Sequence, residues 1–136
     1  MAGSLFPKEM MVSGELTQET ILEKFVYFET QLHLLHLQTP SHAEHSALNV
    51  YDDVADMKDT VLELLMGYEN RKVKAHKFTP ITDYNVGMPN KVVNELKAFA
   101  KQLETFAASK GYSDIENLSQ ELSGKSAKTL YLLTQS

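Results

Sequence analysis

Apolar side chains recur every three or four residues along four stretches of the chain, which is the period of an α-helix with one buried face. The stretches are residues 17–38, 41–69, 89–110 and 113–133. No stretch shows the alternation of apolar and polar residues that is typical of a half-buried β-strand. The pattern therefore predicts an all-α protein with four helices.

Residues that favour helix ends flank these stretches. Thr17 is suited to cap the first helix, and Pro40 lies just past its end, because the residue before a proline avoids the helical conformation. Capping boxes of the form S-x-x-E begin at Ser41 and Ser113. Gly111 follows the third helix, where glycine is the common terminator. The boundaries are thus set by local chemistry as well as by periodicity.

The lengths of the connections predict how the helices are arranged. The first and second helices, and the third and fourth, are joined by short turns, so each pair should be antiparallel. Residues 70–88 form a long connection with no clear period, long enough to cross the whole bundle. The second and third helices should then be parallel. A four-helix bundle with one long crossover is the ferritin-like arrangement, and we expect it over residues 17–136, preceded by an arm of residues 1–16.

Composition narrows the chemistry and the location. The chain has 136 residues and no cysteine, which excludes disulfides and thiolate metal ligands. It contains no apolar run of the length needed to cross a bilayer, and no secretory signal is apparent at the N-terminus. We therefore expect a cytoplasmic protein that does not bind membranes.

Charge is unevenly distributed along the chain. The formal net charge is −5, and residues 41–69 contain seven acids against a single lysine. A short basic segment follows, with its charges on Arg71, Lys72, Lys74 and Lys77. Affinity for DNA comes largely from neutralised phosphates, so strong nucleic-acid binding is not expected of such a chain.

Residues 33–63 carry the side chains best suited to hold a metal ion. They include four of the five histidines and six acids. Imidazole and carboxylate ligands suit iron, with manganese or zinc as alternatives. The candidate ligands are His36, His45, Asp59 and Glu63, followed by His33 and Asp52; His42 ranks below them, and His76 is expected to be an ordinary surface residue.

The spacing of these candidates indicates a site shared between subunits. Asp59 and Glu63 are four residues apart, so their side chains point the same way from one helix. His45 and Asp59 are about 21 Å apart along that helix, too far to bind the same ion. A neighbouring copy packed antiparallel would bring its carboxylates to His36 and His45. We therefore expect a homo-oligomer, a dimer or larger.

The same residues resemble a known group of proteins. Residues 36–63 resemble the corresponding region of the Dps mini-ferritins, with His36-Leu37-Gln38-Thr39 in place of an H-W-N-like motif, His45 as the second histidine, and Asp59 and Glu63 as the carboxylates. The chain is also similar to phage-encoded ferritin-like proteins of unassigned function, through HLLHLQTPSHAEHSALNVYDD and the segment from Ile115 to Thr134. The resemblance covers roughly residues 20–70 and 90–134.

The resemblance implies a specific function, although the chain differs from the Dps pattern at several positions. Dps proteins oxidise Fe(II) at sites between two subunits, so an iron-binding protein with ferroxidase activity is implied, located in the bacterial host cell if the chain is phage-encoded. His36 and His45 are closer together than their Dps counterparts, Asn49 replaces an aspartate, and a lysine-rich tail for DNA is missing.

Several alternatives remain open. Histidines near a turn often cap carbonyls, and an acidic stripe is usually a solvated surface, so a non-enzymatic phage structural or assembly protein could keep the same bundle. A conventional ferritin site inside one bundle needs a histidine on the last helix, which has none. Gly124-Lys125-Ser126 lacks the upstream glycine of a phosphate-binding loop. Nucleophilic catalysis has no supporting arrangement of residues.

Overall fold

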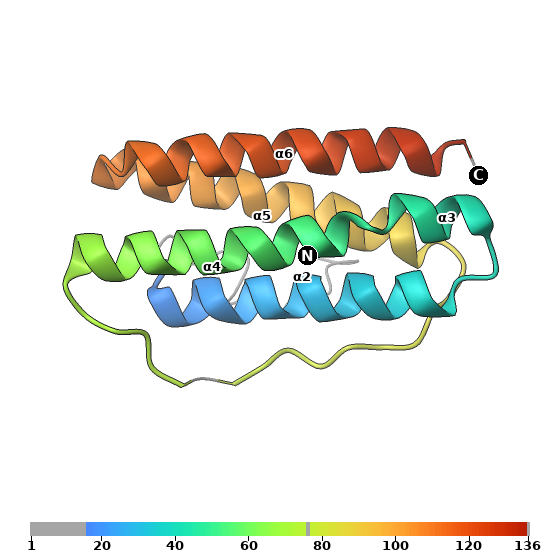
Figure 1. Cartoon of the computed structure of the whole chain (residues 1–136), viewed down its shortest axis with the longest axis horizontal. Coiled ribbons are helices and arrows are strands. Elements are labelled where there is room, and N and C mark those ends of the chain that lie inside the picture. Colours follow the sequence, from blue (N-terminus) through green and yellow to red (C-terminus); the bar gives the residue numbers. More distant parts are fainter. Residues whose placement is uncertain (1–15, 76, 136) are drawn as a thin grey trace.

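The computed structural model describes residues 16–75 and 77–135, so the expected arm and His76 lie outside the described residues, Leu16 apart. The described helices are α2 (Gln18–Gln38), α3 (His42–Ala47), α4 (Val50–Glu69), α5 (Met88–Lys110) and α6 (Ser113–Leu133). The four long ones pack as a bundle (Figure 1). The prediction of an all-α protein with four main helices is confirmed. None of the described helices has the length and apolar character to cross a membrane.

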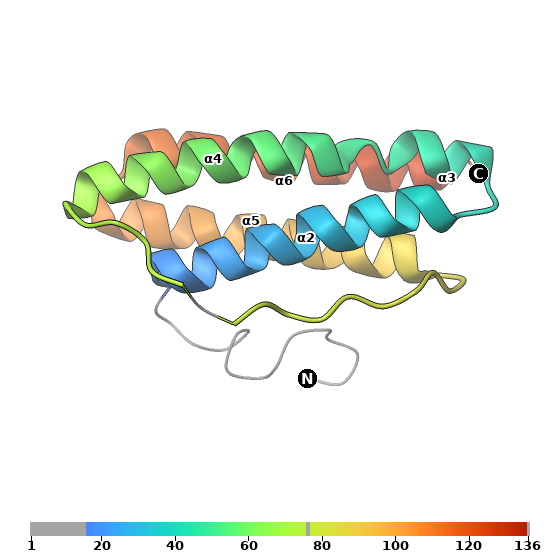
Figure 2. The same cartoon turned by 60° about the horizontal axis from the view of Figure 1, so that its bottom comes forward.

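The order of the helices in space follows the predicted connections. α2 and α4 run antiparallel, as do α5 and α6, and the connection after α4 travels the length of the molecule before α5 begins (Figures 1 and 2). α4 and α5 therefore start at the same end and run parallel, as expected from the long link.

The core consists of the apolar faces that the periodicity predicts. Phe25 and Phe28 on α2 are fully buried, and both contact Phe99 on α5, at ring-centroid distances of 5.1 and 5.7 Å. Edge-to-face and offset aromatic pairs of this kind stabilise a core beyond the area that they bury. These contacts join the two helical hairpins into one bundle.

Most of the helix ends are those expected, with one correction. The Thr17 side chain accepts a hydrogen bond from the Thr20 backbone N–H at 3.1 Å, and Gly111 ends α5 in the left-handed conformation with φ of 77°. The capping box expected at Ser113 is wrong: Ser113 is the first residue of α6, and Tyr112 at the cap position makes no side-chain capping bond. Here the helix begins one residue earlier than the box would place it.

The second predicted helix is divided in two. Residues 48 and 49 form a tight turn between α3 and α4, in which the Asn49 N–H donates to the carbonyl of Ser46, three residues back, at 3.2 Å. This tighter bonding is of the 3₁₀ type, and Asn49 is a poor helix former. After the break, Val50 and Val54 are buried, whereas Tyr51 is only partly buried.

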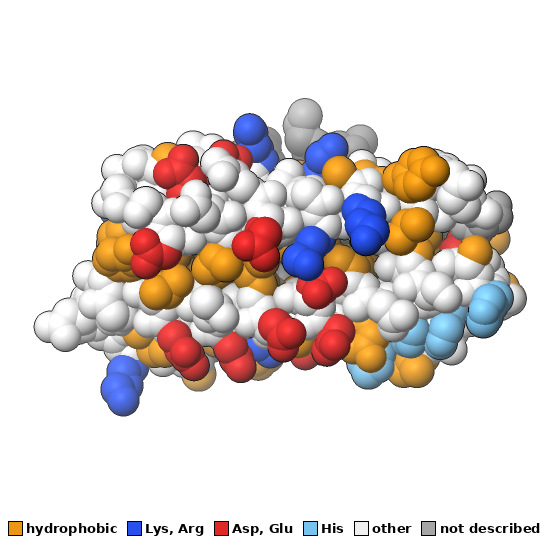
Figure 3. Space-filling view, turned by 45° about the horizontal axis from the view of Figure 1, so that its top comes forward, with side chains coloured by type: hydrophobic (Ala, Val, Ile, Leu, Met, Phe, Trp, Pro, Cys, Tyr) orange, Lys and Arg blue, Asp and Glu red, His pale blue; other side chains and the backbone are white. Residues whose placement is uncertain are grey.

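The predicted carboxylate ligands of α4 lie on its exposed side. Asp52, Asp59 and Glu63 are all exposed. The molecular surface shows a row of acidic side chains along one edge, with histidines at one end of that edge (Figure 3). Lys58 lies between the helices, where its Nζ donates to Glu29 on α2 at 2.6 Å.

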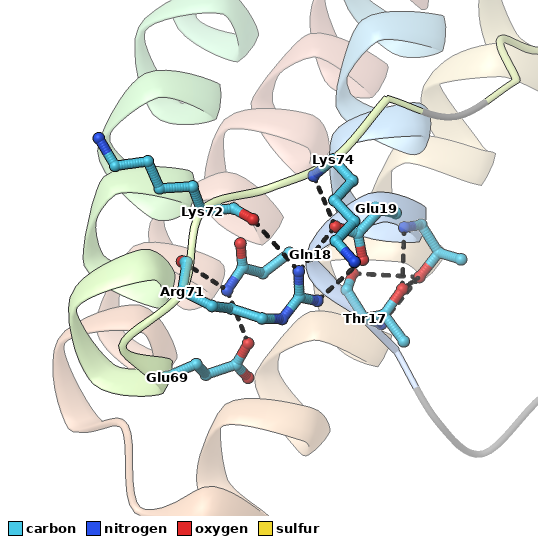
Figure 4. A network of polar contacts seen from close by, with 8 residues as sticks. Thr17, Gln18, Glu19, Glu69, Arg71, Lys72 and Lys74 are labelled. Carbon is cyan, nitrogen blue, oxygen red and sulfur yellow. Dashed lines mark hydrogen bonds and ion pairs between the residues drawn. The ribbon is translucent and has the colours of Figure 1, made fainter.

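The long connection is held to α2 at both of its ends. Near its start, Arg71 donates two hydrogen bonds of 2.8 Å to Glu19, and the Lys74 backbone N–H donates a third of 2.7 Å to the same carboxylate (Figure 4). Near its end, buried Gln31 bonds both the N–H and the carbonyl of Thr82, each at 2.8 Å. Side chains of α2 thus bond several backbone groups of the segment that lacks helical periodicity.

Candidate metal centre

The centre of the histidine region is a reciprocal pair formed by His36 on α2 and His45 on α3. Nδ1 of His36 lies 2.6 Å from the backbone oxygen of His45, and Nδ1 of His45 lies 2.7 Å from the backbone oxygen of His36. Their rings stack with centroids 3.8 Å apart and an interplanar angle of 20°. Two bonds and one stacking contact therefore join the ends of two helices across a short turn.

The helix sequence explains why each carbonyl needs this partner. In a continued helix the carbonyl of His36 would accept from the N–H of residue 40, but Pro40 has none. The carbonyl of His45 would accept from Asn49, whose N–H instead donates to Ser46 at the break before α4. Each imidazole thus satisfies the carbonyl that the proline or the break leaves without a helical donor.

These bonds determine the form of both imidazoles. A carbonyl oxygen only accepts hydrogen bonds, so each Nδ1 must carry the hydrogen. In the neutral ring the lone pair is then on Nε2, which is the atom left to bind a metal. Metal-binding histidines commonly donate their other ring N–H to a backbone carbonyl, which orients the ring. The pair has the hydrogen bonding that a metal ligand needs.

Two further histidines extend the pair into a row. His33 stacks on Tyr51 at 4.1 Å between ring centroids, and its ring is 6.2 Å from that of His36. His42 is exposed, with its ring 6.5 Å from that of His45. The structure therefore brings together His33, His36 and His45 of the predicted ligands, with His42 at the edge.

The predicted carboxylates are not part of this cluster. Asp59 lies on α4 fourteen residues beyond His45, which corresponds to about 20 Å of helix. Within residues 16–75 and 77–135, no three histidine, aspartate or glutamate side chains are placed to hold one metal ion. One chain thus supplies two imidazoles in contact and, separately, a row of exposed carboxylates. A complete metal site would need both sets from different copies.

The sequence analysis did not foresee a second polar network beside the histidines. The hydroxyl of Thr39 donates to Glu44 at 2.6 Å, and the phenol of Tyr84 donates to the same carboxylate oxygen at 2.9 Å. This carboxylate raises the pKa of Tyr84. Ser41 accepts from the Glu44 N–H as a capping residue should, at 3.1 Å, but the Glu44 side chain turns to Thr39 and Tyr84 instead of completing the box. No local pattern connects residue 84 to this turn.

The comparisons with known proteins place this region within a family. Residues 36–133 match the DUF5856 family, described as a family of unknown function. The chain belongs to the DUF5856 family. The match begins at His36 and includes the histidine pair, the acidic row of α4 and both later helices. Neither the curated proteins nor the solved structures contain a match to this DUF5856 chain.

Proposed function

We propose that this DUF5856 protein is a ferritin-like iron-binding protein in which His36 and His45 of one copy, with Asp59 and Glu63 of another, hold the metal. The observation that carries the proposal is the reciprocal bonding of the two Nδ1 atoms, which orients both rings and puts the lone pair of each neutral ring on Nε2; His45 is exposed, and His36 is 8% exposed. The parallel arrangement of α4 and α5 supports the ferritin-like topology.

The ligand chemistry fits iron. Neutral imidazoles and carboxylates bind Fe(II) with positions left for water or dioxygen. In the ferroxidase reaction each Fe(II) gives up one electron, and one dioxygen takes four electrons and four protons to form two waters. Carboxylates such as Asp59 and Glu63 suit the Fe(III) product, and the exposed row on α4 offers more of them. Manganese and zinc suit the same ligands and serve as competitors in a test.

The test separates metal binding from the structural role of the histidines. An asparagine amide N–H can replace a histidine Nδ1–H as donor, but it provides no counterpart to Nε2. We therefore expect His45→Asn to keep the fold and lose Fe(II) binding, measured by titration under anaerobic conditions. Glu63→Ala should lose binding similarly, with Asp114→Ala, which removes another exposed acid, as the control.

Mixing the variants tests the shared geometry. A mixed dimer of His45→Asn and Glu63→Ala contains one site with all its ligands, so Fe(II) binding should partly return. If the wild-type protein does not bind Fe(II), the proposal is refuted. Binding lost in His45→Asn but unaffected in Glu63→Ala would locate the metal on one chain and refute the shared site.

A second function is favoured by the same contacts. The carbonyls of His36 and His45, which lack helical donors, account for both imidazole Nδ1 bonds. The histidines then have a structural role alone, and the protein is a non-enzymatic bundle, such as a structural or assembly component. In that case the wild type binds no Fe(II), and His45→Ala lowers stability while His45→Asn largely restores it. Metal titration and thermal unfolding on the same three proteins distinguish the two functions.

A further inference from the structure

The exposed face formed by α4 and α6 carries two hollows separated by an ion pair. Lys125 on α6 lies 3.6 Å from Asp53 on α4, and both side chains line both hollows. Each hollow has a volume of about 230 Å³. Met57 and Leu118 line one of them, and Leu132 lines the other. Ser46 and Ala47, which follow His45 on α3, also line the second hollow, so this face borders the histidine region, but none of the four proposed iron ligands lines either hollow.

Two leucines and two opposite charges flank Lys125 along α6, the leucines at equal spacing and the charges four residues before it and three residues after it. Leu118 and Leu132 are seven residues before and after it, which is about 10 Å in each direction. Glu121 and Lys128 lie between, on opposite sides of Lys125, and both are exposed. Figure 3 looks onto this face and shows basic side chains grouped near its middle, with acidic side chains beside them and toward the end opposite the histidines. Reversing the direction of the helix therefore exchanges acid for base and leucine for leucine.

We propose that this face binds a second copy of the chain, with the two α6 helices antiparallel and crossing at Lys125. A two-fold axis in the plane of the face and perpendicular to the helices relates such copies, as in most homodimers. Lys128 of each copy then meets Glu121 of the other. Leu132, which is 38% exposed, enters the hollow that Met57 and Leu118 form in the second copy.

The apolar surface at the end of α6 supports this occupant. Tyr131 is 64% exposed beside Leu132, and a tyrosine with one apolar face is a frequent anchor of protein interfaces. In the dimer both residues move from water to the second copy's surface. The opposite charges fix the antiparallel direction, because parallel helices would place each acid against an acid.

A charge exchange tests the dimer directly. Lys128→Glu alone puts two acids together at both ends of the contact, and Glu121→Lys alone puts two bases together, so each variant should dimerise at least about tenfold more weakly than the wild type. An equimolar mixture should recover dimers, because each copy then meets its opposite charge at both ends. Sedimentation velocity over a range of protein concentrations, in the presence of a chelator, measures the extent of dimerisation of the wild type, each variant and the mixture. The control is Lys97→Glu at an exposed position of α5, which changes the net charge by the same amount as Lys128→Glu.

The outcomes decide between this face and others. A dimer in chelator that weakens in both reversals and recovers in the mixture supports the proposal, and Leu132→Asp should weaken it as well. A wild type that stays monomeric in chelator overturns it, and so does a dimer that neither reversal affects. Loss of Fe(II) binding in His45→Asn with the dimer unchanged would separate this contact from the proposed metal site.

Discussion

Lys24 on α2 lies inside the bundle, and its ammonium donates to Gln102 on α5 at 2.7 Å. The side chain is only 1% exposed, and its Nζ lies 5.7 Å from the ring centroid of Phe99. Burial lowers the pKa of Lys24 to about 8, because a charged ammonium is less stable away from water. A lysine in the centre of an apolar contact thus makes the stability of the bundle depend on pH.

Stability should rise between about pH 8 and pH 10. Above pH 8 the folded protein releases the Lys24 proton, while the unfolded chain holds it up to its ordinary pKa of 10.5, so higher pH favours the folded state. The gain is up to about 3 kcal/mol. It should reverse at higher pH, since burial raises the pKa of Tyr27 above its ordinary value. Urea unfolding between pH 8 and pH 10 measures the rise in the free energy of unfolding. Lys24→Met should abolish this rise, and Lys97→Met at an exposed position should leave it unchanged.

The histidine pair should contribute to stability without any metal. His36→Ala removes the donor to the carbonyl of His45 and the stacking contact, and an unsatisfied polar group of this kind costs about 1–3 kcal/mol. His36→Asn keeps a donor, so its loss should be smaller. Thermal unfolding in chelator compares the two. Equal losses in both variants would show that the hydrogen bond contributes nothing beyond packing.

Gln31 should hold the long connection in place. Its amide makes two hydrogen bonds to the backbone of Thr82, so Gln31→Leu removes both and should destabilise the protein by about 1–3 kcal/mol, at about 0.5–1.5 kcal/mol for each bond. We also expect faster proteolytic cleavage between residues 77 and 87, measured by mass spectrometry of the fragments. Gln120→Leu is the control, because that glutamine bonds only the exposed side of α5 through Glu104. An unchanged cleavage rate in Gln31→Leu would contradict this anchoring role.

Glu19 should give the protein a modest acid dependence. The hydrogen bond from Arg71 lowers the pKa of Glu19 to about 2, from an ordinary value of 4.5. The stabilisation is therefore complete above pH 4.5 and is lost as the pH falls toward 2. Since Glu19 is partly exposed, we expect no more than about 1 kcal/mol. Comparing wild type with Glu19→Gln by unfolding at pH 6 and pH 3 measures it, and the difference between them should shrink at the lower pH.

The parts of the fold that local patterns determine were predictable. Phe25, Phe28 and Phe99 follow a helical period, and they form the core. Pro40 predicts the end of α2 from local sterics alone. The sequence analysis did not predict the turn at Asn49, because apolar residues keep a helical period on both sides of it. That period predicts one continuous helix, and a single poor helix former does not change the prediction.

Less of the candidate site could be predicted from the sequence. Sequence spacing indicated that His36 and His45 would lie near one turn, which the structure confirms. Carbonyl capping by histidines near a turn was one of the alternatives, and both rings do bond carbonyls. The sequence did not reveal that the two histidines bond each other's carbonyls, because the break at Asn49, which leaves the His45 carbonyl without a helical donor, was not foreseen. The contact of Tyr84 with Glu44 depends on where a distant segment of chain comes to lie, and no short-range pattern encodes it.

The long connection also has a consequence for how the chain folds. α2 with α4 and α5 with α6 are each hairpins of neighbouring segments, and they are joined only through residues 70–87 along the chain. Each hairpin can form from local contacts, and the slow event is then their docking through the Phe25, Phe28 and Phe99 cluster. Loop closure depends only weakly on length, so the entropy of the connection adds little to that barrier. Two separate peptides cut within this segment should therefore still recognise each other and rebuild the bundle.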